Sequence, residues 1–355
     1  MTFLWINLVI VFIFAYFARF LAIPALNSEL TVPIRPNKLF VFIAMLSLVL
    51  ISGLRANIGD TYFYKHAFTG NNFEWSNVSQ QKNIGFWIFQ MILKQFSEDP
   101  QILIFTAALF TNVLIVLVLV NYSRMIELSL YVYITGGLFL ISMNGIRQVM
   151  TAAILFTGTK FLIEGKWYYY FLIVVFASTF HESALILIPI YFLVRYKAWS
   201  KATWLLLVCS IIIVIGYDQF STLLFSAIED TQYGHYSEFQ EGGANIVRVA
   251  VDAVPLLIAF LGREKLREIF PSSDYIVNMT LVGFIFMIIS TQNWIFARFT
   301  IYFTLYQLIL ISWMIKLFHK KDQRFMYFCL VVCYFLYYFY ENVITLNIQY
   351  RSEFF

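Results

Sequence analysis

Seven ionisable side chains stand within or beside long apolar stretches of this 355-residue sequence. An ionisable group there is costly, at about 2.5–3.5 kcal/mol for an arginine at the centre of a membrane helix, and tends to mark function. Guanidinium groups suit bidentate binding of phosphate, while imidazole and carboxylate groups can accept a proton. These side-chain types therefore predict a site that binds an anionic ligand, with an acid–base group beside it. The seven are Arg55, Asp60, Arg147, His181, Glu182, Asp252 and Arg298.

Arg147 and Arg298 are the candidate ligands for the anion. Arg147 begins an apolar run just after a Met143-Asn144-Gly145 turn, and Tyr302 follows Arg298 by one helical turn. Neither arginine lies in a basic loop, so a role as a cytoplasmic anchor does not explain them. Two guanidinium groups without such a role favour an anionic ligand. A structural ion pair with a nearby carboxylate is the alternative.

His181 and Asp60 are the candidate acid–base residues. His181 opens the sequence His-Glu-Ser-Ala-Leu, where Leu185 replaces the second histidine of a zinc-binding HExxH motif. A zincin is therefore excluded, and an imidazole lining a cavity could instead take a proton from a sugar hydroxyl. Asp60 shares a helical face with Tyr64. The alternatives are a buried histidine that satisfies a broken helix, and an ordinary capped interfacial helix.

The amino-acid composition shows which class of protein must hold these side chains in place. Hydrophobic residues make up 61% of the chain and charged residues 12%, with a mean hydropathy of +0.76. Soluble domains contain about 45–50% apolar and ~25% charged residues. This excludes a soluble enzyme, a disordered protein and a nucleic-acid binder. The net charge of +4 needs no nucleic acid, because most of the basic excess falls in short loops.

Apolar runs predict an all-α polytopic membrane protein, since a crossing needs roughly 20 mostly apolar residues. A turn at 143–145 separates two shorter runs, and residues 167–194 are too long for one span, so we expect a re-entrant or hairpin pair bent near His181. The total is about twelve membrane segments in a single transmembrane domain, 1–355. The runs are 3–23, 38–54, 101–120, 128–143, 147–163, 167–194, 202–217, 245–262, 275–291, 294–316 and 325–340.

Loop charge predicts the orientation. The loop 218–243 holds five acidic residues and no Lys or Arg, whereas 195–201, 263–267 and 316–324 are basic. The positive-inside rule places the basic loops in the cytoplasm, together with Arg19 and Arg124, and it places 218–243 and both termini outside. The loop 55–98, with an interfacial helix, then lies outside, as do the turn at 143–147, the bend at 181 and the tail 341–355. All seven ionisable residues except Asp252 fall on that outer face, which predicts one external cavity.

Together these motifs resemble the EpsG family, the Wzy-like polymerases of bacterial exopolysaccharide and O-antigen synthesis. The order and spacing agree over nearly the whole chain. Two departures stand out: Gln349 replaces a proline usual in the family tail, and the segment before Gly85-Phe86 lacks the family's frequent glutamate. The matching pieces are Arg55 with Gly59-Asp60-Thr61 and Tyr64, Ile146-Arg147-Gln148, Phe180-His181 with Ser183-Ala184, Arg298 with Tyr302, and Ile348-Gln349-Tyr350.

The resemblance implies a C-type membrane glycosyltransferase in the bacterial cytoplasmic (inner) membrane. Such an enzyme moves a growing glycan from undecaprenyl diphosphate to the terminal sugar of another lipid-linked repeat unit. It would act without metal or cofactor, among membrane lipids, with a flippase and a chain-length regulator as partners and no nucleic acid. The implied catalytic residues are His181, Arg147, Arg298 and Asp60, and the implied substrate-binding residues are Arg55, Tyr64, Gln148, Ser183, Tyr302 and Tyr350.

Three other functions remain open at this point. A transporter or flippase of lipid-linked sugars would show a second polar cluster accessible from the cytoplasm, together with internal repeats. A ligase would transfer finished glycan to another acceptor, such as lipid A core. A membrane acyltransferase would need His181 on the cytoplasmic side, against the loop charges.

Overall fold

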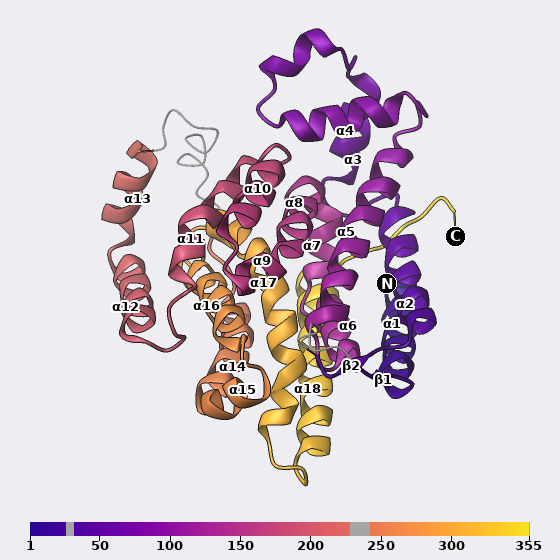
Figure 1. The fold of residues 1–355 in the computed structure, drawn as a ribbon. Helices are drawn as coiled ribbons and strands as arrows, with labels where there is room; N and C mark the ends of the chain where they lie inside the picture. Colours follow the sequence, from indigo (N-terminus) through magenta and orange to yellow (C-terminus); the bar gives the residue numbers. More distant parts are fainter. Residues whose placement is uncertain (26–31, 228–241, 355) are drawn as a thin grey trace. The chain divides into compact units, whose positions relative to one another are not determined.

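The computed structural model describes residues 1–25, 32–227 and 242–354 (Figure 1). Within these ranges the secondary structure is helical apart from a small hairpin, in which β1 (Ile23–Pro24) pairs antiparallel with β2 (Ile34–Arg35). The predicted all-α architecture is therefore confirmed. The chain forms two compact units, Met1–Tyr191 with Ile311–Phe355 and Phe192–Leu310. A single transmembrane domain stays a prediction.

Long apolar helices form the body of the first unit. α1 (Thr2–Phe20) packs on both α2 (Lys38–Gly53) and α6 (Ile126–Thr135), and α5 (Gln101–Tyr122) packs on both α2 and α8 (Ile146–Thr157). The start of α2 is set by Asn37, whose side chain accepts hydrogen bonds from the backbone N–H groups of Leu39 and Phe40. This is a helix N-cap, which satisfies donors that no helical carbonyl can reach.

Shorter helices follow α2 and flank α5 to α8. The segment predicted as an external loop contains α3 (Thr61–Gly70), the 3-10 helix η1 (Trp75–Gln80) and α4 (Ile84–Lys94). Figure 1 shows α3 and α4 at one end of the first unit. After α6 the chain forms α7 (Leu138–Asn144), then α8 and α9 (Thr159–Glu164). The predicted turn at 143–145 thus lies between α7 and α8.

The segment 167–194 folds as the predicted hairpin. α10 (Trp167–Ser178) ends before His181, and the chain resumes with the 3-10 helix η2 (Glu182–Ile186) and α11 (Leu187–Leu193). The rings of Tyr170 and Tyr191 lie 5.4 Å apart, so the far ends of the two arms meet. At 12 residues, α10 is about 18 Å long, well short of a bilayer's hydrocarbon core of roughly 30 Å. α10 is therefore too short to cross a bilayer by itself, and a re-entrant pair in the membrane stays a prediction.

The predicted count of about twelve membrane segments is not confirmed. Within the described ranges, four helices are long and apolar enough to cross a bilayer, and two bent helix pairs raise the number to six. Several predicted spans are helices of only 10–17 residues. Two others are bent at glycines: α6 and α7 bend by 55° at Gly136-Gly137, and the chain bends by 96° at Gly216. Gly137 has a φ of 88°, which a residue with a Cβ rarely adopts.

The second unit contains α12 (Lys201–Ile215), α13 (Tyr217–Ala227), α14 (Ile246–Leu261), α15 (Arg263–Ile269), α16 (Ser273–Ile289) and most of α17 (Ile295–Met314). α12 and α14 both pack on α16. The predicted acidic loop 218–243 begins inside α13, and residues 228–241 lie outside the described residues.

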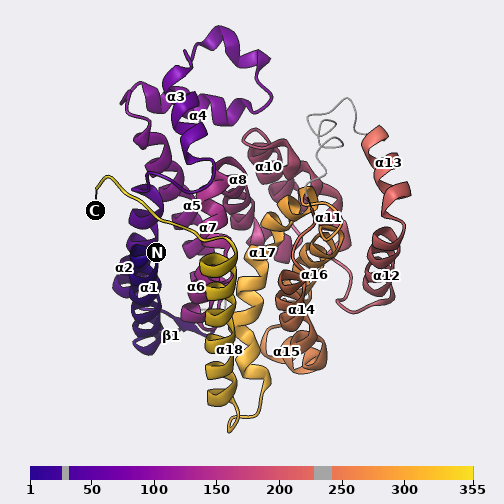
Figure 2. The same cartoon turned by 180° about the vertical axis from the view of Figure 1, so that it is seen from behind.

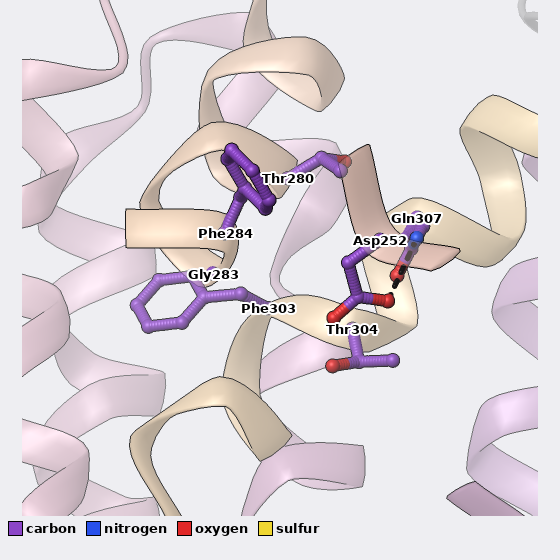
Figure 3. Close-up of a pocket in the computed structure, with 7 residues that line it drawn as sticks. All are labelled: Asp252, Thr280, Gly283, Phe284, Phe303, Thr304 and Gln307. Atoms are coloured by element: carbon purple, nitrogen blue, oxygen red, sulfur yellow. Dashed lines mark hydrogen bonds between the residues drawn. The ribbon is translucent and has the colours of Figure 1, made fainter. Parts of the chain in front are cut away.

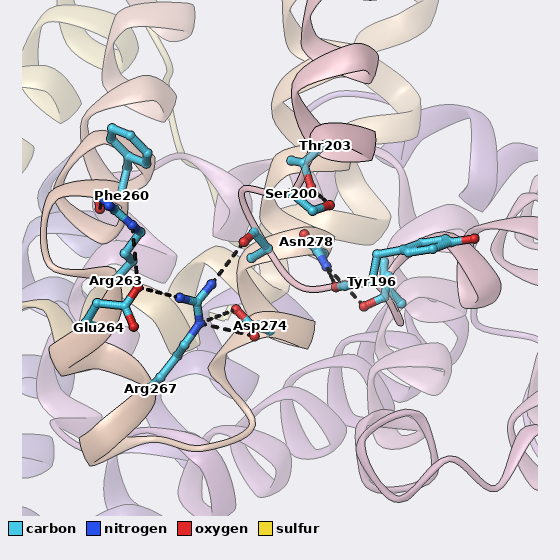
Figure 4. Close-up of polar contacts among 11 residues, drawn as sticks. Tyr196, Ser200, Thr203, Phe260, Arg263, Glu264, Arg267, Asp274 and Asn278 are labelled. Carbon is cyan, nitrogen blue, oxygen red and sulfur yellow. Dashed lines mark hydrogen bonds and ion pairs between the residues drawn. The ribbon is translucent and has the colours of Figure 1, made fainter.

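Two loops predicted to share the cytoplasmic side meet in this unit (Figure 4). Arg267 donates to the carbonyl of Ala198 at 3.0 Å and pairs with Asp274 at 3.0 Å and Glu264 at 2.9 Å. Asn278 donates to the carbonyl of Tyr196 at 2.6 Å. The basic loops 195–201 and 263–267 therefore lie at the same end of the unit, as the charge pattern requires.

Residues of the first unit predicted to be cytoplasmic also meet. Arg19 pairs at 2.6 Å with Glu127, which is fully buried in the first turn of α6. Arg124 and Lys316 lie within electrostatic reach of the same carboxylate. Three cations and one carboxylate thus form a polar cluster at this end of the unit.

The chain returns to the first unit through the end of α17, the 3-10 turn η4 (Ile315–Leu317), α18 (Gln323–Tyr338) and a π-helical turn (Phe339–Thr345). Beyond Thr345 it runs back toward the N-terminus of α1 (Figure 2). The rings of Tyr350 and Phe3 lie 5.8 Å apart. The tail and the start of α1 therefore share one end of this unit, as predicted for two termini on one side.

Candidate functional site

One apolar cluster in the first unit holds together the segments that carry the predicted motifs. Its buried members include Phe86 of α4 and Ile146 at the start of α8, and Tyr64 and Phe180 pack against it. Ile146 directly precedes Arg147, Phe180 directly precedes His181, and Tyr64 is itself a candidate. The cluster therefore fixes the relative positions of α3, α4, α8 and the bend before η2, from which the polar side chains project.

Arg147, Asn83 and the backbone of Phe180 meet beside this cluster. When the Asn83 amide is oriented with its oxygen toward Arg147, that oxygen accepts from Nη1 of Arg147 at 3.3 Å, and its nitrogen donates to the Phe180 carbonyl at 3.3 Å. The Nε atom of Arg147 is buried and has no hydrogen-bond partner among the described residues. A guanidinium held by one long bond and left with a buried, unmet donor is suited to receive an anionic oxygen.

A close backbone contact holds α4 against the end of α10. The N–H of Gly85 donates to the carbonyl of Thr179 at 2.8 Å. A Cβ added at Gly85 would lie 2.2 Å from Oγ1 of Thr179, which no side chain could tolerate. Glycine at this position therefore allows the contact that brings Asn83 to Phe180 and Arg147.

We expect Gly85→Val to separate these segments and to lower activity far more than it lowers the amount of folded protein. The measurement is polymer formed per mole of protein recovered in the membrane. Gly70→Val is the matched control, because a Cβ at Gly70 meets nothing within 4 Å. Adding Thr179→Gly should restore part of the activity by removing the clashing side chain. Full activity of Gly85→Val alone would contradict this role for the contact.

The structure joins two predicted site residues, His181 and Ser183. Nδ1 of His181 lies 2.7 Å from Oγ of Ser183, which is buried at the start of the second arm of the hairpin. His181 itself is half-buried and has extended backbone angles at the break between α10 and η2. If Nδ1 carries the hydrogen and donates to Ser183, Nε2 is left with a lone pair and can act as a base. Ser183 would then orient the imidazole.

Arg55 is buried in the protein, with 1% of its surface exposed. Its guanidinium donates to Thr61 Oγ1 at 3.0 Å, to the carbonyl of Met143 at 2.8 Å and to the carbonyl of Ser52. Burial lowers the pKa of Arg55 to about 9, so the side chain still carries its charge at neutral pH. These contacts join the ends of α2 and α7 to the start of α3. They favour a positioning role over direct contact with the ligand.

The Gly59-Asp60 segment lies against the α7–α8 turn. Gly59 has a φ of 50°, and a Cβ there would lie 2.1 Å from Oδ1 of Asn144. The same oxygen accepts from the N–H of Asp60 at 3.0 Å. Asp60 occupies the N-cap position of α3, but its side chain makes no capping hydrogen bond and is exposed. Its carboxylate is therefore not engaged in holding the helix.

Two of the remaining candidates in the first unit line its packed interior. Tyr64 is half-buried, and its ring makes an edge contact with Phe86 at 6.1 Å. Gln148 is 7% exposed, directly after Arg147 in α8. The side chain of Tyr64 therefore reaches the apolar cluster, as a residue that shapes a pocket wall would.

Tyr350 belongs to a tail that is clamped onto the segment after α2. Its hydroxyl donates to the carbonyl of Ile51 at 2.9 Å. Asn57 donates to the Gln349 carbonyl at 2.6 Å and accepts from the N–H of Arg351 at 2.7 Å. The tail thus supports the segment that carries Arg55, and the hydroxyl of Tyr350 is already used by the protein.

Arg298 and Tyr302 lie in the second unit, on α17. The guanidinium carbon of Arg298 stands 4.6 Å from the centre of the Trp294 ring, and the side chain is exposed. Tyr302, one turn later, is 2% exposed. Stacking on an indole face is a favourable arrangement for a guanidinium and restricts its orientation.

The first unit therefore brings together Arg147, His181, Ser183, Arg55, Asp60 and Tyr64 in neighbouring segments, from motifs far apart in the sequence. A model of the EpsG family matches residues 38–352. The chain belongs to the EpsG family. Membership is consistent with a membrane protein of the polysaccharide-polymerase type. No curated protein and no solved structure matches the chain.

The described residues of this EpsG-family chain contain no group of three or more His, Cys, Asp or Glu side chains placed to hold a metal ion. The gathered candidates include two guanidinium groups, Arg55 and Arg147, one imidazole, His181, and one carboxylate, Asp60. The arrangement can therefore bind an anionic group and transfer a proton.

Two asparagines in the site escaped prediction. Asn83 links Arg147 to Phe180, and Asn144 links the α7–α8 turn to Asp60. Neither is charged, and their roles depend on contacts across long stretches of sequence. The only available signals were local: Asn83 precedes Gly85-Phe86, and Asn144 lies in the expected turn.

Proposed function

We propose that this EpsG-family chain polymerises lipid-linked oligosaccharide repeat units at the outer face of the bacterial cytoplasmic membrane. The substrate is a glycan carried on undecaprenyl diphosphate. The observation that carries the proposal is the buried Nε of Arg147, which has no hydrogen-bond partner among the described residues. The segment that carries Arg147 packs against the same apolar cluster as the segment that carries His181. An anion-binding group beside a base suits transfer of a glycosyl group from a diphosphate.

The reaction breaks one bond and forms another. The bond between the sugar's anomeric carbon and the diphosphate oxygen breaks, and the electron pair leaves with undecaprenyl diphosphate. A hydroxyl of the terminal sugar of a second lipid-linked unit attacks the same carbon and forms the new glycosidic bond. Its proton passes to Nε2 of His181, oriented through Nδ1 by Ser183. Asp60 is the second candidate base, since its carboxylate is exposed and caps nothing.

Arg147 neutralises the charge that develops on the leaving diphosphate, and its open Nε donor supports this role. Arg298, on the second unit, is the second arginine that the sequence predicts to bind the diphosphate, and its guanidinium stacks on Trp294. Arg55, which is bonded to Met143 and Thr61, positions the segments around the site. Tyr64 shapes a wall of the site in the first unit, where Gln148 follows Arg147 on α8. Tyr302, on the second unit, keeps its predicted role in binding substrate. Tyr350 acts indirectly, because its hydrogen bond to Ile51 helps to hold the C-terminal tail against the segment after α2.

The loop charges support placing the reaction at the outer face of the membrane. Nucleotide sugars are absent there, so a donor must arrive on a lipid. An opening between helices to the bilayer would admit the two polyprenyl chains.

The test uses purified protein in lipid vesicles with a synthetic undecaprenyl-diphosphate repeat unit as the only substrate. We expect a ladder of products on a sizing gel, each step one repeat unit longer. Transfer of glycan only to an added lipid A core acceptor would favour a ligase. Movement of the unit across the bilayer without a ladder would overturn the proposal in favour of a transporter.

The transporter alternative has one observation in its favour. The cluster of Arg19, Arg124 and Lys316 around Glu127 is a second polar group, at the end predicted to face the cytoplasm. Its carboxylate is fully buried and paired, which suits a structural role. We therefore prefer the polymerase.

A further inference from the structure

Asp252 and Glu182 are the two ionisable residues of the original seven that the proposed polymerase site does not use, and of these Asp252 lines a pocket. Asp252 lies in the middle of α14 and faces a small pocket formed with α16 and α17 in the second unit (Figure 3). The other polar side chains that line the pocket are Thr280, Thr304 and Gln307. A carboxylate within an apolar helix is expensive and usually has a partner or a ligand.

The hydrogen atoms that these side chains could offer are largely committed elsewhere. Thr280 Oγ1 donates to the carbonyl of Ile276 at 2.9 Å, and Thr304 Oγ1 donates to the carbonyl of Thr300 at 2.9 Å. Gln307 Nε2 donates to Oδ1 of Asp252 at 3.2 Å. What remains is a set of lone pairs on two hydroxyls, the amide oxygen and the second carboxylate oxygen. In Figure 3 that second oxygen lies on the side of Thr304, away from Gln307.

A pocket with acceptors and one negative charge attracts a cation. Hard cations take oxygen ligands of these kinds, namely carboxylate, hydroxyl and amide oxygens. Arg248, one turn earlier on α14, lies within electrostatic reach of the Asp252 carboxylate but does not line the pocket. The pocket's own residues therefore supply a single negative charge.

Size limits the ligand further. The space that the centre of a water molecule can occupy in the pocket is about 10 Å³, enough for roughly one water-sized group. A sugar or a lipid amine is too large. A divalent ion would be poorly matched by one carboxylate, and the described residues offer no group of three acidic or imidazole ligands. A dehydrated Na⁺ ion fits both the volume and the charge.

Two backbone features support such a site. A Cβ on Gly283 would lie 2.7 Å from Cβ of Phe303, so glycine lets α16 and α17 approach closely there. Pro255 lies inside α14 and has no N–H, which leaves the carbonyl of Val251 without its usual helical donor. Helix irregularities of this kind accompany ion sites in membrane proteins. We propose that the pocket around Asp252 binds one Na⁺ ion, independently of the polymerase reaction.

The test measures binding of radioactive ²²Na⁺ to the purified full chain in lipid nanodiscs. We expect saturable binding of one ion per chain, displaced by unlabelled Na⁺ and not by choline. Asp252→Asn removes the charge and should abolish saturable binding. Thr304→Val removes one oxygen ligand at constant shape and should weaken binding by roughly 10–100-fold, the range for perturbed ion sites. Thr304→Ser keeps the hydroxyl and should bind as the parent does.

Asp218→Asn is the matched control, because Asp218 is an exposed aspartate of the same unit and its side chain should not contribute. If Asp252→Asn does not fold, the Thr304→Val and Thr304→Ser pair decides the matter. The absence of saturable binding in the parent protein would overturn the proposal, as would equal binding by Thr304→Val and Thr304→Ser. Because binding is measured without glycan substrate, the outcome does not depend on the proposed polymerase activity.

Discussion

Replacing Arg147 by alanine is expected to lower the rate of chain growth by roughly 10²–10³-fold, the usual effect of removing one donor to a developing negative charge. The guanidinium has a buried Nε without a partner among the described residues and one long bond to Asn83. Its loss removes charge where the diphosphate leaves while disturbing few protein contacts. The measurement is the rate at which the product ladder forms from the synthetic repeat unit.

Three further variants separate ligand binding from structure. Arg147→Lys keeps the charge but not the planar fork, so its rate should fall between those of the parent and alanine variants. Asn83→Ala removes the protein partner of Arg147 and should have a smaller effect than Arg147→Ala. Arg351→Ala is the matched control, since Arg351 is exposed and contributes backbone bonds to the tail clamp. Equal losses in Asn83→Ala and Arg147→Ala would mean that Arg147 serves only to hold Asn83.

Replacing His181 by glutamine should lower chain growth by roughly 10²–10⁴-fold, the range for removal of a general base. Glutamine keeps the size and a hydrogen-bonding group but cannot take up a proton. The parent rate should fall as the pH is lowered, because a protonated imidazole cannot accept the acceptor's proton. This fall is the acidic limb of the pH–rate profile. The residual rate of His181→Gln should not show the acidic limb, whereas replacing a histidine with a merely structural role would leave the limb in place.

Ser183→Ala tests the orienting hydrogen bond. Removing Oγ leaves Nδ1 of His181 without this partner at 2.7 Å and should reduce the rate less than His181→Gln does. The acidic limb should persist, because the imidazole is still present. His66→Gln is the matched control, since His66 is an exposed histidine of α3. If Asp60→Asn removed the acidic limb and His181→Gln kept it, Asp60 would be the base.

Much of the fold was predictable because apolar runs and helices coincide in a membrane protein. α2, α5 and α14 begin and end within a few residues of the runs 38–54, 101–120 and 245–262. The hairpin was predictable from its length and from the polar pair at its centre. The number of spans was not, because single glycines decide whether a run stays straight. Nothing in the composition of 128–143 indicates that Gly137 adopts a left-handed conformation.

Residue types in the site were predictable, but their roles depended on three-dimensional contacts. Arg55 and Arg147 look alike in sequence, since each lies at the predicted outer end of an apolar run. The structure buries Arg55 among backbone carbonyls and leaves Arg147 with an open donor. The pairing of His181 with Ser183 lay within reach of sequence, because the two are only two residues apart. The contact of Asn83 with Arg147 joins positions far apart in the sequence, with no pattern that links them, and could not be found that way.

The contacts between the C-terminal tail and the segment after α2 can form only late in the synthesis of the chain. Ser352 donates to the carbonyl of Leu54 across a separation of 298 residues, so the segment carrying Arg55 enters the membrane long before its support is synthesised. At about 5–20 residues per second, that interval is roughly 15–60 s. Throughout it, the segment that carries Arg55 lacks its hydrogen bond from the tail. The candidate site is therefore complete only after the last residues of the chain have been synthesised.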